Sequence, residues 1–378
     1  MHSHRTWAGG YNALVSKRII IAGGGLSGLA TAVLLARRGL QVRVHDRRRG
    51  GGGRFSGGWQ VLENGTTRQD ALAELTVLGF PGSPPVIPVH RALLLDSFGG
   101  RHEVYSREPY TYFVRRGPEA SLDSWLRTQA LDAGVELAEG AAAPADADVV
   151  ATGPRQADGV AREVVFSSDL PDTVAVLFDP TITPTGYAYL FCLQGHATFG
   201  VAQVRGVAGL PGAAERAWQV FRRELGAFAV ADRCRGGQFM NFFLPGSLQD
   251  GQGRWYVGEA AGVQDFLYGL GNRLALRSAA LAADGLQGRW DEKRFRSMVV
   301  TPMRTTVALR VLYEALGRKG WRSFCSVASR RDFREFLLML QRPRPATLAV
   351  SALARVLWRE RRGCRHGTMC TWCRRSER

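Results

Sequence analysis

The chain has 378 residues, of which 45% are hydrophobic and 22% are charged. This length and balance suit one large domain or two closely packed ones, and they exclude a globally disordered chain. The formal net charge of +17 predicts attraction to anionic surfaces such as phospholipid headgroups, nucleic acid or phosphorylated substrates.

Nothing in the first residues predicts export. Residues 1–17 lack a charged-then-apolar signal pattern with a cleavage site, and the apolar run 19–36 is interrupted by four glycines. The six cysteines are scattered, with three in the last fifteen residues, which does not indicate a disulfide framework. We therefore expect a protein of the cytoplasm, a reducing compartment.

A strand–turn–helix–strand unit opens the chain, with a buried strand at 18–22, a helix at 26–38 and a second strand at 40–45. Further along, the pattern predicts other elements: a helix at 122–133, strands at 135–137 and 149–150, antiparallel strands within 163–203, a strand at 255–258, a helix at 272–283, and basic helical sequence from 291 onward.

The first turn carries Gly23, Gly25 and Gly28 in G-x-G-x-x-G spacing directly after a strand and at the start of a helix. In such turns the first glycine permits the tight turn, the second lets the backbone approach a pyrophosphate, and the third lets helix and strand pack closely. Asp46 follows the next strand, where a carboxylate binds ribose hydroxyls. A dinucleotide site is predicted, and a glycine-rich turn of some other α/β protein is the alternative.

Two later segments favour FAD over NAD. Val149-Val-Ala-Thr-Gly153 resembles the strand and turn that return to the nucleotide in flavoproteins. Gly258-Glu-Ala-Ala-Gly262, followed by Gly269-Leu-Gly271-Asn272, resembles their second FAD fingerprint, in which an acid reaches the ribityl hydroxyls and a helix N-terminus faces the flavin. Glu259 is that acid here, where the family usually has Asp.

Together these motifs resemble the geranylgeranyl reductase branch of the flavoprotein superfamily that also contains the aromatic hydroxylases, over residues 18 to about 290. The segment Pro184–Phe191 is similar to the P-x-x-Y-x-W-x-F-P signature of that branch, with Tyr189 for Trp and Cys192 for Pro. The loop Gly50–Phe55 departs from it: the cysteine of the reductases is absent, and the loop resembles the G-G-R turn in which an arginine reaches the FAD phosphates.

The resemblance implies a set of site residues. Those expected to bind FAD are Gly23, Gly25, Leu26, Ser27, Gly28, Asp46, Arg54, Arg115, Thr152, Gly153, Gly258, Glu259, Gly269, Gly271 and Asn272. Arg116 is the alternative to Arg115, and a surface arginine is the alternative to both. Tyr187, Tyr189 and Phe191 are expected to contact substrate, with Tyr187 or Tyr189 as a candidate acid, unless this alternation is ordinary sheet packing.

The resemblance also implies a fold and an activity. The fold class is α/β: a Rossmann-type FAD-binding domain with an interleaved antiparallel β-sheet substrate domain and a helical C-terminal region. The expected boundaries are 16–80, 115–155 and 250–290 for the first, 81–114 and 156–249 for the second, 291–357 for the third, and 358–378 for a basic tail.

The expected reaction is reduction of carbon–carbon double bonds in an isoprenoid or other apolar substrate by hydride from reduced flavin. An FAD-dependent monooxygenase is the alternative, and a non-catalytic membrane- or nucleic-acid-binding protein that retains the fold is the second alternative. No second G-x-G-x-x-G unit is present, so NAD(P)H that docks transiently, or a partner such as reduced ferredoxin, would supply the electrons. No specific nucleic-acid module is recognised.

The basic C-terminal region allows two further hypotheses. Residues 348–358 mix apolar residues and arginine in an amphipathic pattern suited to the inner membrane surface, and packing on the protein's own body is the alternative. Cys364, His366, Cys370 and Cys373 could close a tetrahedral zinc site, and solvated thiols or a redox pair are the alternatives.

Overall fold

The computed structural model describes residues 18–357 except 51, 53, 56, 155–156, 205–206 and 241–243. Its first layer is a five-stranded, wholly parallel sheet, built where short apolar runs such as Ile19–Ala22 become buried on both faces. In spatial order the strands are β15 (Trp255–Tyr256), β9 (Val149–Val150), β1 (Ile19–Ala22), β2 (Val42–Asp46) and β8 (Glu136–Glu139).

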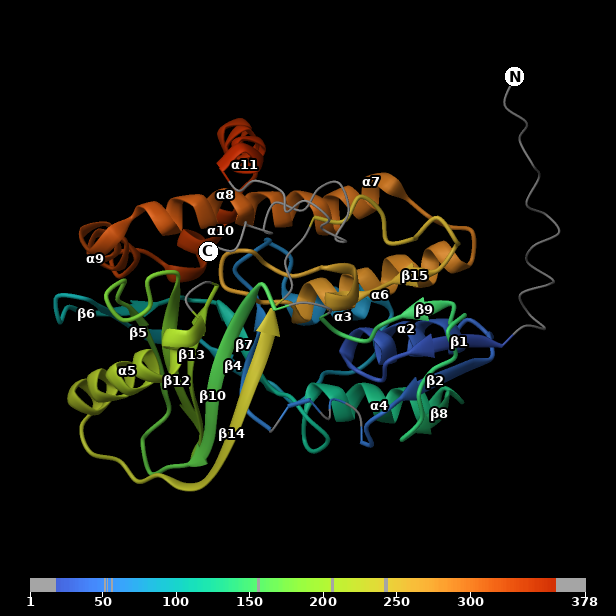
Figure 1. The fold of residues 1–378 in the computed structure, drawn as a ribbon, viewed down its shortest axis with the longest axis horizontal. Coiled ribbons are helices and arrows are strands. Elements are labelled where there is room, and N and C mark those ends of the chain that lie inside the picture. Colours follow the sequence, from blue (N-terminus) through green and yellow to red (C-terminus); the bar gives the residue numbers. More distant parts are fainter. Residues whose placement is uncertain are drawn as a thin grey trace.

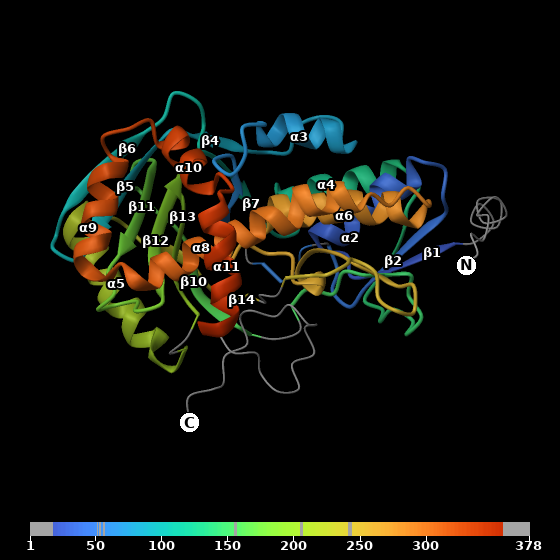
Figure 2. The same ribbon diagram turned by 90° about the horizontal axis from the view of Figure 1, so that it is seen from above.

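Helices cover this sheet. Because Leu26 to Leu35 are all buried, α2 (Leu26–Ala36) is a central helix. It contacts both α4 (Leu122–Asp132) and α6 (Asn272–Leu286), and Figure 2 shows the three helices beside one another. A further helix, α3 (Ala71–Leu78), contacts α6. Strand β1 lies between β2 on one side and β9 on the other. The chain runs from β1 to β2 and later returns to the opposite side of β1, so a topological switch point lies between β1 and β9. Ligands of open α/β sheets bind at such points, outside the carboxyl ends of the strands.

The second layer is a seven-stranded sheet beside the parallel one (Figure 1). In spatial order its strands are β14 (Ala231–Met240), β10 (Gly159–Ser167), β13 (His196–Gln203), β12 (Gly186–Leu193), β11 (Thr173–Phe178), β5 (Arg91–Asp96) and β6 (Arg101–Tyr105). Helix α5 (Leu210–Leu225) packs on it. All neighbours are antiparallel except β11 and β5, which pair in parallel.

A small antiparallel sheet joins the two layers, with β7 (Thr111–Arg115) between β3 (Trp59–Glu63) and β4 (Ile87–Val89). Pro88 lies in β4, an edge strand, where its missing N–H costs no ladder hydrogen bond. Short 3₁₀ turns span Val207–Gly209 and Gly258–Ala261.

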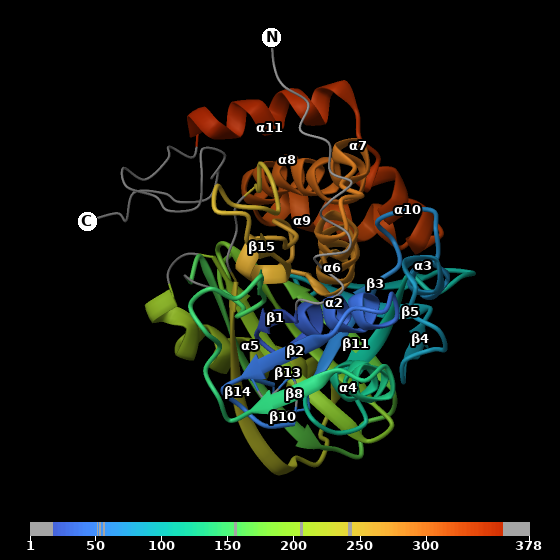
Figure 3. The same ribbon diagram turned by 90° about the vertical axis from the view of Figure 1, so that its right-hand side faces the viewer.

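The last part of the described chain is helical. It consists of α7 (Glu292–Phe295), a π-helical turn (Arg296–Val300), α8 (Thr301–Ala315), α9 (Gly317–Ala328), α10 (Phe333–Gln341) and α11 (Pro345–Leu357). Helix α11 contacts α8 and crosses the top of the molecule in Figure 3. The predicted fold class is therefore confirmed: a Rossmann-type sheet, a β-rich layer built mainly of antiparallel strands, and a helical C-terminal region.

Candidate active site

One cavity of about 890 Å³ extends from the carboxyl ends of the parallel strands to the seven-stranded sheet. It is lined by most of the residues expected to bind FAD: Gly23, Gly25, Leu26, Ser27, Asp46, Arg54, Thr152, Gly153, Gly258, Glu259, Gly269, Gly271 and Asn272. It is also lined by Tyr187, Tyr189 and Phe191. The two glycine turns and the aromatic strand, far apart in sequence, thus border the same space.

The three glycines of the first turn serve different purposes. Gly23 has a φ of +107°, and a Cβ there would lie 2.3 Å from the Ala151 carbonyl oxygen. A Cβ on Gly28 would lie 1.9 Å from the Gly23 carbonyl oxygen, so Gly28 allows helix and strand to pack and does not itself line the cavity. A Cβ on Gly25 would meet nothing within 4 Å. Gly25 therefore faces open space in the cavity, where a backbone can approach a ligand.

Two helix N-termini face this cavity. Gly25 caps α2 and Gly271 caps α6, and neither cap supplies a side-chain hydrogen bond to the first turn. Backbone N–H groups at these ends lack intrahelical partners, and each end carries a partial positive charge. Such ends bind phosphates.

Asp46 ends β2 at the edge of the cavity. Its carboxylate accepts hydrogen bonds from the backbone N–H of Gly24 (2.6 Å) and of Arg48 (2.8 Å). These bonds fix the carboxylate beside the first glycine turn, the place that the sequence predicts for a group that binds ribose.

Arg54 and Glu259 join the loop after β2 to the second glycine turn. Two hydrogen bonds of 3.0 and 3.1 Å connect the guanidinium to both carboxylate oxygens. Burial alone would lower the pKa of Arg54, but the carboxylate of Glu259 reverses this, so the pKa is raised and the guanidinium stays charged.

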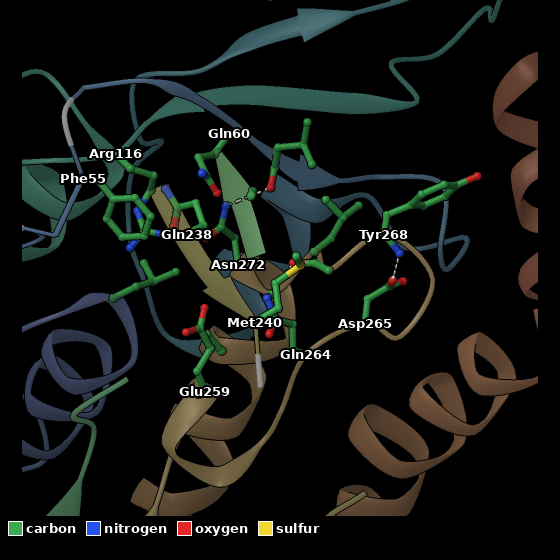
Figure 4. A pocket seen from close by; sticks show the side chains of 18 of the residues that line it. Phe55, Gln60, Arg116, Gln238, Met240, Glu259, Gln264, Asp265, Tyr268 and Asn272 are labelled. Carbon is green, nitrogen blue, oxygen red and sulfur yellow. Dashed lines mark hydrogen bonds between the residues drawn. The ribbon is translucent and has the colours of Figure 1, made fainter. Parts of the chain in front are cut away.

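The structure distinguishes between the two adjacent arginines. Arg115 donates to the Gly57 carbonyl oxygen at 3.2 Å and does not line the cavity. Arg116 does line it: its guanidinium donates to both carboxylate oxygens of Asp123 (2.7 and 2.9 Å) and to the Asn272 side-chain oxygen (2.6 Å). Its guanidinium also lies 4.2 Å from the ring centre of Phe55. Of the two, Arg116 is the arginine that lies at the cavity, beside Phe55 (Figure 4).

At the other end, the alternating residues of β12 present their rings to the cavity. Tyr187 donates its hydroxyl hydrogen to the Tyr268 carbonyl oxygen at 2.7 Å, and Tyr189 donates to a carboxylate oxygen of Glu163. Burial raises the pKa of both tyrosines. Both hydroxyls are therefore engaged with protein groups.

The surrounding wall is mostly apolar. The apolar side chains of β5, β7, β11, α9 and α10 that line it are Ala92, Leu94, Phe113, Val174, Val176, Phe178, Phe324, Phe333 and Leu337. In Figure 4, Phe55, Arg116 and Glu259 lie on one side of the cavity and Tyr268 and Asp265 on the other, with Asn272 between them. The cavity thus has a charged end and an aromatic end.

Three buried carboxyl groups line the cavity and were not anticipated from the sequence. Glu163 accepts from Tyr189 and from the Gln238 side chain, and burial raises its pKa. Asp265 accepts the Tyr268 N–H at 2.6 Å, and burial raises its pKa to about 6. Burial raises the pKa of Glu63 to about 7. The sequence signal that could have indicated Glu63 is its place at the end of the run Trp59–Glu63. The sequence alone does not show whether the Glu63 side chain points inward or outward.

Cys364, His366, Cys370 and Cys373, the predicted zinc ligands, lie outside the described residues. Within the described ranges no group of three or more His, Cys, Asp or Glu side chains could hold a metal ion. None of the helices in those ranges combines the length and hydropathy needed to cross a membrane.

Comparison with known proteins agrees with this geometry. Residues 21–68 match the family model of the NAD(P)-binding Rossmann-like domain. A segment of 49 residues is 47% identical to carotenoid phi-ring synthase of Streptomyces griseus, but this covers 13% of the chain and only 10% of that relative.

Solved structures extend the similarity to most of the chain. A geranylgeranyl bacteriochlorophyll reductase-like protein from Thermoplasma acidophilum aligns with a TM-score of 0.65 at 14% identity, over 89% of this chain and 95% of that one. A p-nitrophenol 4-monooxygenase from Pseudomonas putida aligns with a TM-score of 0.60 at 14% identity, over 87% and 100%. A halogenase in complex with FAD aligns with a TM-score of 0.54 at 13% identity, over 89% and 90%. The chain thus shares its fold with these three proteins, one of which was solved with FAD bound.

The residues present fit FAD. Gly25 leaves open space where a side chain would obstruct the cavity, and the two uncapped helix ends offer unpaired N–H groups to a pyrophosphate. A cavity of about 890 Å³ is large for a single small ligand. Its volume and its two distinct ends suit a dinucleotide with a substrate beside it.

Proposed function

We propose that this protein is an FAD-dependent oxidoreductase that reduces carbon–carbon double bonds of an isoprenoid or another apolar substrate. The observation that carries the proposal is the single cavity that joins two uncapped helix N-termini to an aromatic chamber. Bound FAD in its reduced form would supply hydride to the substrate, and the protein provides binding, orientation and a dry chamber.

The residues of the charged end would hold the cofactor. Asp46 would accept hydrogen bonds from ribose hydroxyls, the N–H groups that follow Gly25 would bind the pyrophosphate, and Arg54 would add positive charge beside it. Glu259 and Asn272 reach the cavity from the second turn, where the ribityl chain and the ring would lie. These roles are the ones expected from the sequence, and the residues that would perform them line the same cavity.

The distribution of charge supports an apolar substrate. The arginines that line the cavity are Arg47, Arg48, Arg54 and Arg116, which come from the loop after β2 and the approach to α4. The aromatic end carries no arginine or lysine among the described lining residues, only carboxyl groups that burial favours in the neutral form. An anionic headgroup would find no cationic side chain among these described residues, so the buried part of the substrate is expected to be uncharged.

A monooxygenase is the second candidate. The similarity to p-nitrophenol 4-monooxygenase covers almost as much of the chain as the similarity to the reductase-like protein. The loop Gly50–Phe55 also lacks the cysteine of the reductases. Such an enzyme would insert an oxygen atom from O₂ into an aromatic or apolar substrate in the same chamber.

The proposal includes an electron donor and contact with a membrane surface. NAD(P)H that docks transiently, or a reduced protein such as ferredoxin, would reduce the flavin. The net charge of +17 and the exposed apolar side chains Leu348 and Leu353 of α11 favour contact with an anionic membrane surface, where a lipid substrate resides.

An anaerobic experiment separates the candidates. The purified protein is loaded with FAD, reduced with dithionite and mixed with geranylgeraniol, and flavin absorbance and lipid products are followed. We expect reoxidation of the flavin with a saturated product. Reoxidation only after air is admitted, with an oxygenated product, would support the monooxygenase instead. Failure to bind FAD at all would support a non-catalytic binding protein.

A further inference from the structure

Glu63 is a buried acid with no use in the cofactor site described above. Only 7% of the residue is exposed, it ends β3, and it lines the cavity. Its Oε2 atom is buried and has no hydrogen-bond partner among the described residues. An unpaired buried carboxylate is costly, so a carboxyl group in this setting favours its neutral form and keeps an O–H to donate.

The groups around Glu63 explain why no cation neutralises it. Arg273 and Arg277 of α6 both direct their guanidinium groups to Glu74 of α3, and Arg273 also donates to the backbone carbonyl oxygen of Glu63 at 3.0 Å. Arg334 of α10 donates to the Asn64 carbonyl oxygen and to Glu108.

Asp265 is a further titratable neighbour of Glu63. Its negative charge would disfavour ionisation of Glu63 further. The pKa of Glu63, about 7, results mainly from burial, with the two α6 arginines working against the shift.

Glu63 lies beside α6 and the second glycine turn, the elements that the sequence resemblance expects to face the flavin. Its carbonyl oxygen is held by Arg273, the residue after Asn272 at the start of α6. Its neighbour Asp265 is part of the second glycine turn, since Asp265 N–H donates to the Leu270 carbonyl oxygen (2.8 Å) and Gly269 N–H donates to the Asp265 carbonyl oxygen (3.1 Å). Glu63 is therefore a lining residue of the cavity on the side of α6 and the second glycine turn.

The tyrosines predicted as acids do not compete for this role. Both hydroxyls are engaged with protein groups, and burial raises the pKa of both. Glu163, the other buried glutamate of the cavity, has hydrogen-bond partners on both carboxyl oxygens. Of these groups, Glu63 is the one with a buried oxygen left without a partner.

We propose that Glu63 is the general acid of the reaction and delivers the proton to the carbon–carbon double bond. The proposal rests on the reductase function above. Reduced flavin transfers hydride to one carbon of the double bond and is oxidised, while the O–H of Glu63 breaks and its proton bonds to the other carbon. The carboxylate left behind then takes up a proton from water, so atoms and electrons balance.

The test uses the FAD-loaded protein under anaerobic conditions with geranylgeraniol and compares the wild type with Glu63→Gln and Glu63→Asp. We expect the rate of flavin reoxidation by the lipid to fall about 100-fold or more in Glu63→Gln, as for loss of a general acid, and to recover partly in Glu63→Asp. The wild-type rate should fall as the pH rises past about 7, where Glu63 loses its proton. Glu163→Gln is the matched control and should keep this pH midpoint whatever its rate.

A second readout needs no turnover. Infrared difference spectra of the cofactor-free protein between pH 5 and pH 9 should show a protonated carboxyl band that titrates near pH 7 and is lost in Glu63→Gln but kept in Glu163→Gln. Geranylgeraniol should shift this band. If the wild type does not reduce the lipid, the reductase function fails and the proton-transfer role fails with it. If the wild type reduces it and Glu63→Gln does so at the same rate and pH midpoint, or if the band is absent, the assignment of Glu63 alone is wrong.

Discussion

At the scale of single residues, glycines in one motif differ in what they contribute. A Cβ atom on Gly25 would meet no protein atom within 4 Å, whereas one on Gly28 would lie 1.9 Å from the Gly23 carbonyl oxygen. We therefore expect Gly25→Val to fold with a melting temperature near that of the wild type and to bind FAD at least about tenfold more weakly, a loss of about 1.4 kcal/mol or more.

Gly28→Val is the matched control, and it should lose stability, because the helix would have to move away from the strand. Calorimetry and flavin fluorescence titration measure the two effects. A Gly25→Val protein with unchanged FAD affinity would show that the cofactor does not lie against this turn.

Buried carboxyl groups also predict how stability varies with pH. The pKa of Glu63 is raised from its ordinary value of 4.5 to about 7, so the folded state holds a proton that the unfolded chain releases. The contribution of Glu63 to the free energy of unfolding should therefore be greatest below about pH 4.5. It should fall by about 3 kcal/mol as the pH rises to about 7. Glu63→Gln should remove most of this fall, which urea unfolding at pH 5 and pH 8 would measure.

Glu139 provides a control of opposite sign. Its hydrogen bonds with Arg127 lower its pKa, so its contribution is present above its ordinary pKa and is lost as the pH falls. Glu139→Gln should therefore lower stability at pH 7 more than at low pH. Curves for Glu63→Gln and the wild type that stay parallel from pH 5 to pH 8 would contradict a neutral Glu63 in the folded state.

At the scale of elements, a buried ion pair fixes where β7, α4 and α6 meet. Arg116 follows β7, Asp123 lies in the first turn of α4, and Asn272 starts α6; the guanidinium contacts both of the others. The side chains of Arg116 and Asp123 are 7% and 0% exposed.

Removal of Asp123 would leave a buried charge without its partner, so we expect Asp123→Ala to destabilise the protein by about 3 kcal/mol and to weaken FAD binding. Glu119→Ala, four residues earlier and exposed, should change stability by less than about 0.5 kcal/mol. Equal effects of the two substitutions in urea unfolding would show that this ion pair does not hold the elements together.

The same elements show how far the sequence can be interpreted. The strand, glycine turn and helix of residues 18–46 could be predicted because spacing and local chemistry specify them. The choice between Arg115 and Arg116 could not be predicted. The side chains of adjacent residues point in different directions, and which of the two points to the cavity depends on the register of β7, which the sequence does not give. Glu63 was missed for a related reason: the arginine that holds its backbone comes from α6, 210 residues further along the chain.

At the scale of the whole molecule, helix α11 is a candidate contact with a membrane. One face packs on α8, with Ser351 and Ala354 buried, while Leu348 and Leu353 are 43% and 53% exposed. Both alternatives for this segment therefore have support: the buried residues favour packing on the protein body, and Leu348 and Leu353 form an exposed apolar strip. Figure 3 shows α11 across the top of the molecule. The exposed residues Arg342 and Arg344 precede it.

We expect the protein to sediment with vesicles that contain phosphatidylserine and to remain in solution with pure phosphatidylcholine, because each arginine near an anionic surface adds about 1 kcal/mol. Raising the salt concentration should weaken this binding through screening. Leu348→Glu combined with Leu353→Glu should abolish it, since the apolar strip would carry the same sign of charge as the lipid. Val77→Glu on α3, a side chain 71% exposed away from α11, is the control and should bind as the wild type does. Binding that survives the double substitution unchanged would mean that net charge alone, and not α11, brings the protein to the membrane.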